Sequence, residues 1–199
     1  AGWRASSQVR WDYTSANYPV RVQVRLQSPD GKMWIELLPI DAVYWMDRFT
    51  QGLRVGQRSY GAVYAPNATI EQAMESLVIR PARGNVQGLK IVERRPVDPV
   101  RMAQAFKVQN VRGEAMAMRV RYPLGNATAD EDFYTLYTAI QDIPYTGPQG
   151  TSHEYHRVLL MPHAVGAVDG LLPTVYPLLG VVVASLQRDP AYQQHMQAV

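Results

Sequence analysis

Strict alternation of apolar and polar residues predicts the first strand of this chain. Between residues 20 and 27, valine or leucine takes every even position, and arginine or glutamine takes every odd position. This period of two is typical of a strand that buries one face. Residues 28–31 (Ser-Pro-Asp-Gly) have the composition of a tight turn, and the alternation resumes from Lys32 to Leu38. We therefore predict a hairpin over residues 20–38.

Helical spacing begins at two later points. Thr69 is a typical helix-capping residue, and apolar residues after it recur at the spacing of one helical face until Pro81 ends the pattern. Asp98 followed by Pro99 indicates a second helix start, because the aspartate can cap the helix and proline suits its first position. We expect this second helix to reach Lys107.

Further strands are predicted at four places: residues 89–94, 112–122, 132–140 and 154–161. The short separations between the last three favour antiparallel pairing. Residues 39–61 have no clear period and are predicted to form a loop. Adjacent strands with interspersed helices indicate one domain over residues 1–199 of the α+β class, with a mainly antiparallel sheet packed with helices.

This order of elements resembles the Mog1/PsbP-like fold. The hairpin, the Tyr60-Gly61 pair ahead of the Thr69 helix and the segment from Ala184 to Tyr192 are similar to those of secreted bacterial proteins with this fold. The resemblance covers most of the chain and implies a Mog1/PsbP-like sandwich. Proteins of this fold act as binding or assembly factors in nuclear transport, photosystem assembly and bacterial lipoproteins, so the resemblance also implies a non-enzymatic binding or assembly function.

Composition narrows the available chemistry. The chain has no cysteine, which excludes a disulfide framework, thiolate catalysis and a cysteine-ligated zinc site. The apolar residues 171–186 are interrupted by prolines and are fewer than the roughly 20 of a membrane span, so we predict a buried packing helix and no transmembrane segment. Because the sequence begins at Ala1 rather than methionine, we expect a removed signal or anchor and an extracytoplasmic location in a bacterium.

The sequence contains no standard motif of a catalytic or cofactor-binding site. Gly-x-Ser-x-Gly, Walker and Gly-x-Gly-x-x-Gly spacings are absent from the sequence, so we expect no cofactor. His153, His156 and His163 are close in sequence, but strand residues three apart point to opposite faces, so we expect no metal site. An alternative polar site, drawn from Glu36, Glu154 and His156, pairs the histidine with Glu154 or with Glu36. It would serve a hydrolase-type enzyme if these side chains converged in a cleft.

Basic residues are concentrated between residues 80 and 121. This stretch holds ten of the 20 lysine and arginine residues and only three acidic ones. Guanidinium groups suit an acidic protein, an anionic lipid headgroup or another polyanion, whereas nucleic acid is a poorer candidate because no RNP-like motif is present. Alternatively, these arginines pair with acids from elsewhere in the chain. The acidic residues 130–132 are themselves predicted to form a solvated turn.

Aromatic residues indicate a second surface. The predicted loop contains four candidates: Tyr44, Trp45, Phe49 and Tyr60. Tyrosine and tryptophan are enriched at interfaces, although some of these rings could instead complete the core. We predict that they combine with exposed arginines, in particular Arg119 and Arg121, to bind an unknown protein or an anionic ligand. The alternatives are the hydrolase-type enzyme and a self-associating structural domain.

Overall fold

The computed structural model describes residues 2–12, 20–48, 52–59, 61–108, 112–148 and 150–185. In chain order the strands are β1 (Arg4–Trp11), β2 (Val20–Gln27), β3 (Met33–Leu37), β4 (Asp41–Met46), β5 (Arg58–Ser59), β6 (Ala62–Tyr64), β7 (Lys90–Val97), β8 (Gly113–Leu124), β9 (Ala127–Gly147) and β10 (Gly150–Val168). The helices are α1 (Ile70–Met74), the π-helix η1 (Glu75–Ile79), α2 (Arg80–Arg83), α3 (Pro99–Ala105) and α4 (Leu172–Ser185).

The predicted α+β sandwich is wrong, because the protein is mostly β. Strands make up 54% and helices 21% of the described structure, and the strands form one curled, half-barrel sheet. Residues 41–46, predicted as part of a loop, form strand β4, in which Ala42 and Val43 are buried. β9 and β10 have 21 and 19 residues and extend far beyond their predicted periodic cores. Pairing with a neighbouring strand holds these residues extended whatever their local preference.

Local signals at the hairpin and at the helix starts are confirmed. β2 and β3 pair antiparallel. Thr69 caps α1 in a capping box with Gln72, and the Asp98 side chain accepts from the N–H groups of the first turn of α3. Pro81, by contrast, does not end the helical segment but lies inside α2, directly after the π-helical turn η1. A π-turn changes the hydrogen-bond ladder ahead of a proline, which has no N–H to donate.

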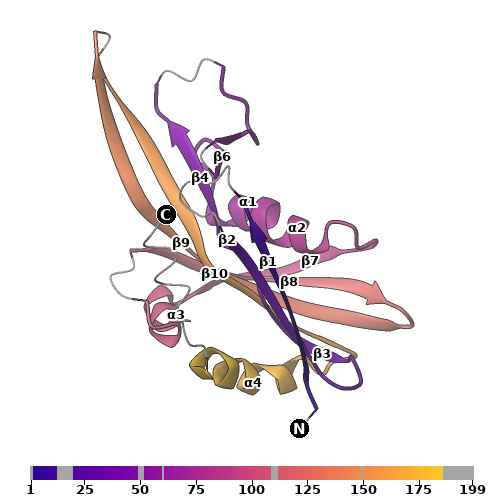
Figure 1. The fold of residues 1–199 in the computed structure, drawn as a ribbon. Coiled ribbons are helices and arrows are strands. Elements are labelled where there is room, and N and C mark those ends of the chain that lie inside the picture. Colours follow the sequence, from indigo (N-terminus) through magenta and orange to yellow (C-terminus); the bar gives the residue numbers. More distant parts are fainter. Residues whose placement is uncertain are drawn as a thin grey trace.

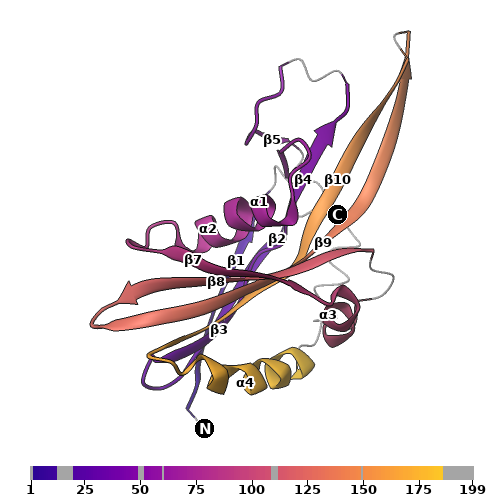
Figure 2. The same cartoon turned by 180° about the vertical axis from the view of Figure 1, so that it is seen from behind.

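The sheet is organised around the long strand β10. Neighbouring strands follow the order β1-β2-β3-β10-β4-β6-β5, while β9, β8 and β7 continue from the other edge of β10. Among the described strands, β4 and β6 are parallel neighbours. Beyond Thr138, β9 no longer pairs with β8 and runs with β10 as a hairpin arm that projects past the body of the sheet (Figures 1 and 2).

Short helices lie against part of each face of the sheet (Figures 1 and 2). On one face, α1, η1 and α2 lie over an apolar cluster that includes Trp34, Met74 and Phe133. On the other face, α4 packs against a second cluster, which includes Ile35 and Val165. Trp34 and its neighbour Ile35 belong to different clusters because successive residues of a strand point to opposite faces. The helical segment on the first face forms one wall of the candidate site.

Candidate functional site: an arginine-lined cleft

Two mirrored tripeptides meet on neighbouring strands near one end of the sheet. β1 contains residues 8–10 (Gln-Val-Arg) and β2 contains residues 21–23 (Arg-Val-Gln). The antiparallel register places identical residues opposite each other: Gln8 and Gln23, Val9 and Val22, Arg10 and Arg21. Because strand side chains alternate between faces, the two arginines and the two glutamines share one face and the valines share the other.

At residues 21–23, the polar face of β2 is turned toward the protein. Val22 is 40% exposed, whereas Arg21 and Gln23 are partly buried. The predicted strand is therefore present with its predicted period, but its valine at position 22 lies on the more exposed face. The polar face is accommodated because it meets polar partners, with Arg21 near Asp41 and Gln23 hydrogen-bonded to Glu36.

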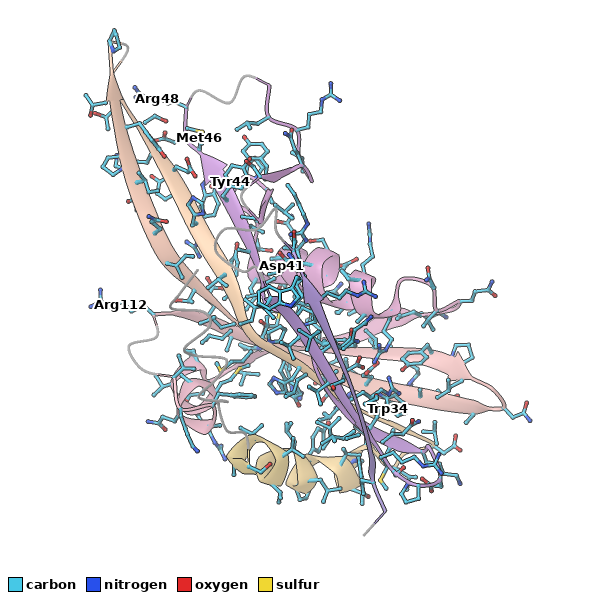
Figure 3. The ribbon with its side chains drawn as sticks, in the orientation of Figure 1. Trp34, Asp41, Tyr44, Met46, Arg48 and Arg112 are labelled. Atoms are coloured by element: carbon cyan, nitrogen blue, oxygen red, sulfur yellow. The ribbon has the colours of Figure 1, made fainter. Side chains whose placement is uncertain are left out.

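A cleft of about 300 Å³ opens beside this polar face. Six polar residues line it: Gln8, Arg10, Arg21, Gln23, Asp41 and Arg58. Six apolar residues complete the lining: Leu38, Pro39, Leu77, Val78, Pro81 and Ala82. The cleft thus has a cationic wall built on strands and an apolar wall built largely on η1 and α2; its central acid, Asp41, is labelled in Figure 3.

Asp41 is the buried acid of the cleft, with 3% of its surface exposed. Arg58 of β5 donates to both carboxylate oxygens, with Nη1–Oδ1 at 2.9 Å and Nη2–Oδ2 at 2.5 Å. This hydrogen bonding with Asp41 raises the pKa of Arg58, which therefore stays charged. The Nη1 atom of Arg21 lies 3.4 Å from the same Oδ2, which is long for a hydrogen bond. Arg58 is therefore the main partner of Asp41.

Arg10 is the least compensated guanidinium group of the cleft. With the amide of Gln8 turned so that its oxygen accepts, that oxygen lies 3.0 Å from both Nε and Nη2 of Arg10. Within the described ranges no carboxylate forms an ion pair with Arg10, while Arg21 is shared between Asp41 and Asp12. Two acids thus meet three arginines, and one positive charge of the cleft is unbalanced. Like charges directly opposite each other on paired strands are unfavourable.

A buried ionic network beneath the cleft ties the helical wall to the sheet. Gln23 Nε2 donates to Glu36 Oε1 at 2.5 Å, and the other oxygen of Glu36 accepts from Arg83 of α2. Arg83 also forks onto Glu131 of β9, with Nε–Oε2 at 2.9 Å and Nη2–Oε1 at 2.7 Å. Burial opposes the charged form of Arg83, but Glu131 and Glu36 outweigh it and raise its pKa. The network therefore fixes α2 against the strands.

The acidic residues 130–132 are not the predicted solvated turn. They lie within β9, and both Glu131 and Asp132 have 0% exposure. Arginines of the basic stretch hold them there: Arg119 Nε lies 2.7 Å from Asp132 Oδ1, and Arg121 Nε lies 2.8 Å from Asp130 Oδ1. Burial works to raise the pKa of Asp132, but hydrogen bonds and the charge of Arg119 lower it overall. Acids from a neighbouring strand therefore neutralise part of the basic stretch.

The structure does not bring the predicted aromatic and arginine residues together. Tyr44 and Trp45 lie in β4 and are only 6% and 8% exposed. Arg119 and Arg121 lie in β8, which is not a neighbour of β4 in the sheet. Two further predicted residues fall outside the described part of the chain: Phe49 and Tyr60. The described members of the set thus occupy separate parts of the molecule.

The alternative polar site is assembled only in part. Glu154 and His156 are two residues apart on β10, share a face, and place Oε1 and Nε2 at 2.5 Å. Glu36 lies elsewhere, bound to Arg83. Over the described ranges His156 has no hydroxyl partner that would act as a nucleophile, and its ring stacks on Tyr44 with centroids 5.9 Å apart. This geometry orients an imidazole without completing a hydrolytic site.

The three histidines of β10 do not converge. His153 Nδ1 lies 2.8 Å from Asp142 Oδ1 on the hairpin arm. His163 is buried, with the rings of Phe106 and Tyr134 each 5.0 Å from its own. The described part of the chain contains no cluster of three or more histidine, aspartate or glutamate side chains that could hold a metal ion.

The sequence contains one signal for the cleft, which lies in the relation between two segments rather than in any single residue. Antiparallel pairing of residues 8–10 with 21–23 sets identical residues side by side, so the mirrored tripeptides themselves indicate the paired arginines. Asp41 and Arg58 carry no comparable signal. They are 17 residues apart and meet only because β4, β6 and β5 are neighbours in the sheet.

Comparisons with known proteins add no relative: no family model, no curated protein and no solved structure matches this chain. The resemblance to Mog1/PsbP-like proteins therefore stays a prediction. In the described part of the chain, no helix is both long and apolar enough to cross a membrane.

Proposed function

We propose that this protein is a non-catalytic binding module whose arginine-lined cleft takes a small anionic ligand. One observation carries the proposal: Arg10 and Arg21 lie directly opposite each other at the cleft, and Arg10 has no carboxylate partner among the described residues. An anion between the two guanidinium groups would offset their repulsion and accept charge-assisted hydrogen bonds from both.

The size and polar lining of the cleft support the proposal. Its volume of about 300 Å³ falls at the lower end of the range for small-molecule sites. Gln8 lies beside the arginine pair and adds an amide N–H group that suits ligand oxygen atoms, whereas the Gln23 amide donates to Glu36. The proposal retains the binding function and the anionic ligand expected from the sequence, but assigns them to β1, β2 and β5. The extracytoplasmic location stays a prediction.

The proposal is tested by titrating the protein with sodium acetate and, separately, sodium phosphate at constant ionic strength. Backbone amide chemical shifts report which residues respond. We expect saturable shifts centred on residues 8–10 and 21–23, because these residues surround the unbalanced charge. In Arg10→Gln the apparent affinity should fall about tenfold, since one charge-assisted pair of hydrogen bonds is lost.

Arg4→Gln is the matched control. Arg4 is also an exposed arginine of β1 but lies outside the cleft, so this variant removes the same charge without touching the site. Its affinity should stay within about twofold of wild type. Equal losses in the two variants, or shifts that never saturate, would mean that the anions only screen the surface charge of the protein.

A further inference from the structure

We infer that the ligand of the cleft is a small amphipathic monocarboxylate, with its carboxylate at Arg10 and Arg21 and its apolar part against η1 and α2. This inference rests on the proposed anion-binding function and adds the chemical class of the ligand. It follows from two features: the unequal walls of the cleft and its net charge.

The wall opposite the arginines is apolar. Leu77 and Val78 of η1 and Ala82 of α2 line it, and Leu38 continues it at the end of β3. A small inorganic anion would contact the arginines and leave this wall in water. A ligand that carries a hydrocarbon part beside its charge would cover both walls at once, and burial of that part adds affinity.

The net charge of the cleft matches one negative charge. Among the described residues, Arg21 and Arg58 pair with the carboxylates of Asp41 and Asp12, and Arg10 pairs with none, which leaves a single positive charge to compensate. A monocarboxylate neutralises this charge, whereas a phosphate dianion would leave the site negative. Asp41 itself demonstrates that a carboxylate fits a guanidinium fork here, because both of its oxygens accept from Arg58.

The buried network fixes the position of the helical wall relative to the strands, so the site exists before a ligand arrives. Arg83 joins α2 to Glu36 and Glu131, and Glu36 is bonded in turn to Gln23 of the cationic wall. A preformed cleft binds without the entropic cost of ordering its walls. Each methylene group added to the ligand should therefore increase its affinity.

Calorimetric titration with acetate, butanoate, pentanoate and hexanoate tests the inference, and butyl phosphate, which carries the same butyl group as pentanoate, compares the headgroups. We expect affinity to rise about two- to fourfold for each added methylene, the gain typical of burial in an apolar site. Butyl phosphate should bind more weakly than pentanoate. A flat response from acetate to hexanoate would overturn the inference and leave the anion site standing, whereas absence of binding by every anion would overturn the proposed function as well.

Two variants locate the apolar part. Leu77→Ser should reduce the gain with chain length and leave acetate affinity within about twofold, because only the apolar wall changes. Val86→Ser is the control, since Val86 is also partly buried near α2 but lies outside the cleft. A chain-length gain that survives undiminished in Leu77→Ser would place the hydrocarbon elsewhere and contradict the inference. Acetate binding by each variant verifies that the cleft is folded.

Discussion

Arg10 and Arg21 are direct cross-strand neighbours at the cleft between β1, β2 and the helical segment. Paired strands are stabilised by opposite charges or apolar contacts across the ladder, and like charges oppose pairing. The described contacts give Arg21 two acidic partners and Arg10 none. This local conflict between charge and strand pairing is the kind of feature that accompanies a binding function.

The first prediction concerns stability without ligand. Arg10→Gln should stabilise the protein by less than about 1 kcal/mol at low ionic strength, because it removes the repulsion with Arg21. The gain should vanish in about 1 M salt, where screening is strong. Urea denaturation at both ionic strengths measures it. Arg4→Gln, in which the altered residue faces Gln27, should show no such gain, and destabilisation by Arg10→Gln at low salt would count against repulsion.

Replacing Arg83 at the centre of the buried network should change stability more than the replacement of Arg10. Arg83→Met should destabilise the protein by about 3–5 kcal/mol, because Glu36 and Glu131 would lose their shared cation while 2% and 0% exposed. Denaturant unfolding measures the loss. Adding Glu36→Gln and Glu131→Gln should restore part of the stability, since no unpaired charge then remains buried.

Arg80→Met is the control for the network. Arg80 begins the same helix and is exposed, so its replacement should change the free energy of unfolding by no more than about 0.5 kcal/mol. If Arg83→Met behaved like Arg80→Met, the network would not hold α2 to the sheet.

The buried His163 predicts a loss of stability in mild acid. Burial lowers its pKa from 6.5 to about 4, with an opposing contribution from the Met161 carbonyl. The unfolded chain therefore binds a proton more readily than the folded one between these values. Stability from this residue is complete above about pH 6.5 and declines as the pH falls toward 4. The loss across this interval should approach about 3 kcal/mol.

Urea denaturation of wild type and His163→Gln across this pH interval measures the effect. The variant should lose less stability on acidification, because glutamine does not titrate. Asp132 is not expected to interfere, since its lowered pKa makes its stabilising contribution disappear only below the usual value of 3.8. Parallel pH profiles for the two proteins would exclude His163 as the origin of the loss.

A glycine of β10 is required by close packing. Gly166 lies opposite Trp34, and a Cβ atom at position 166 would overlap the indole ring. Gly166→Ala should therefore destabilise the protein by about 1–3 kcal/mol or more, as expected for overpacking of a core. Thermal unfolding measures the loss. Gly180→Ala makes the same chemical change in α4, where the new Cβ has open space, and should raise stability by about 0.5–1 kcal/mol.

The sequence alone was sufficient for features whose causes lie within a few residues. The hairpin of β2 and β3 follows from alternation and a turn, and the starts of α1 and α3 follow from Thr69 and Asp98, whose side chains bond to N–H groups of the next turn. The mirrored residues 8–10 and 21–23 also contain the information for the paired arginines, because pairing of two nearby strands is partly a local property.

Tertiary structure decided the rest, because the partners are distant in the chain. Trp34 bonds to Glu131 across 97 residues and Arg83 reaches Glu36 across 47, so the burial of these acids depends on partners that local composition cannot identify. In the same way, residues 41–46 were predicted to form a loop but form strand β4, because they pair with β10. The alternating period of β2 could be recognised in the sequence. The face of β2 that lies toward the helical segment was determined by polar partners on β3 and β4. Alternation specifies that a strand has two faces, and only the burial of complementary groups determines which face turns inward.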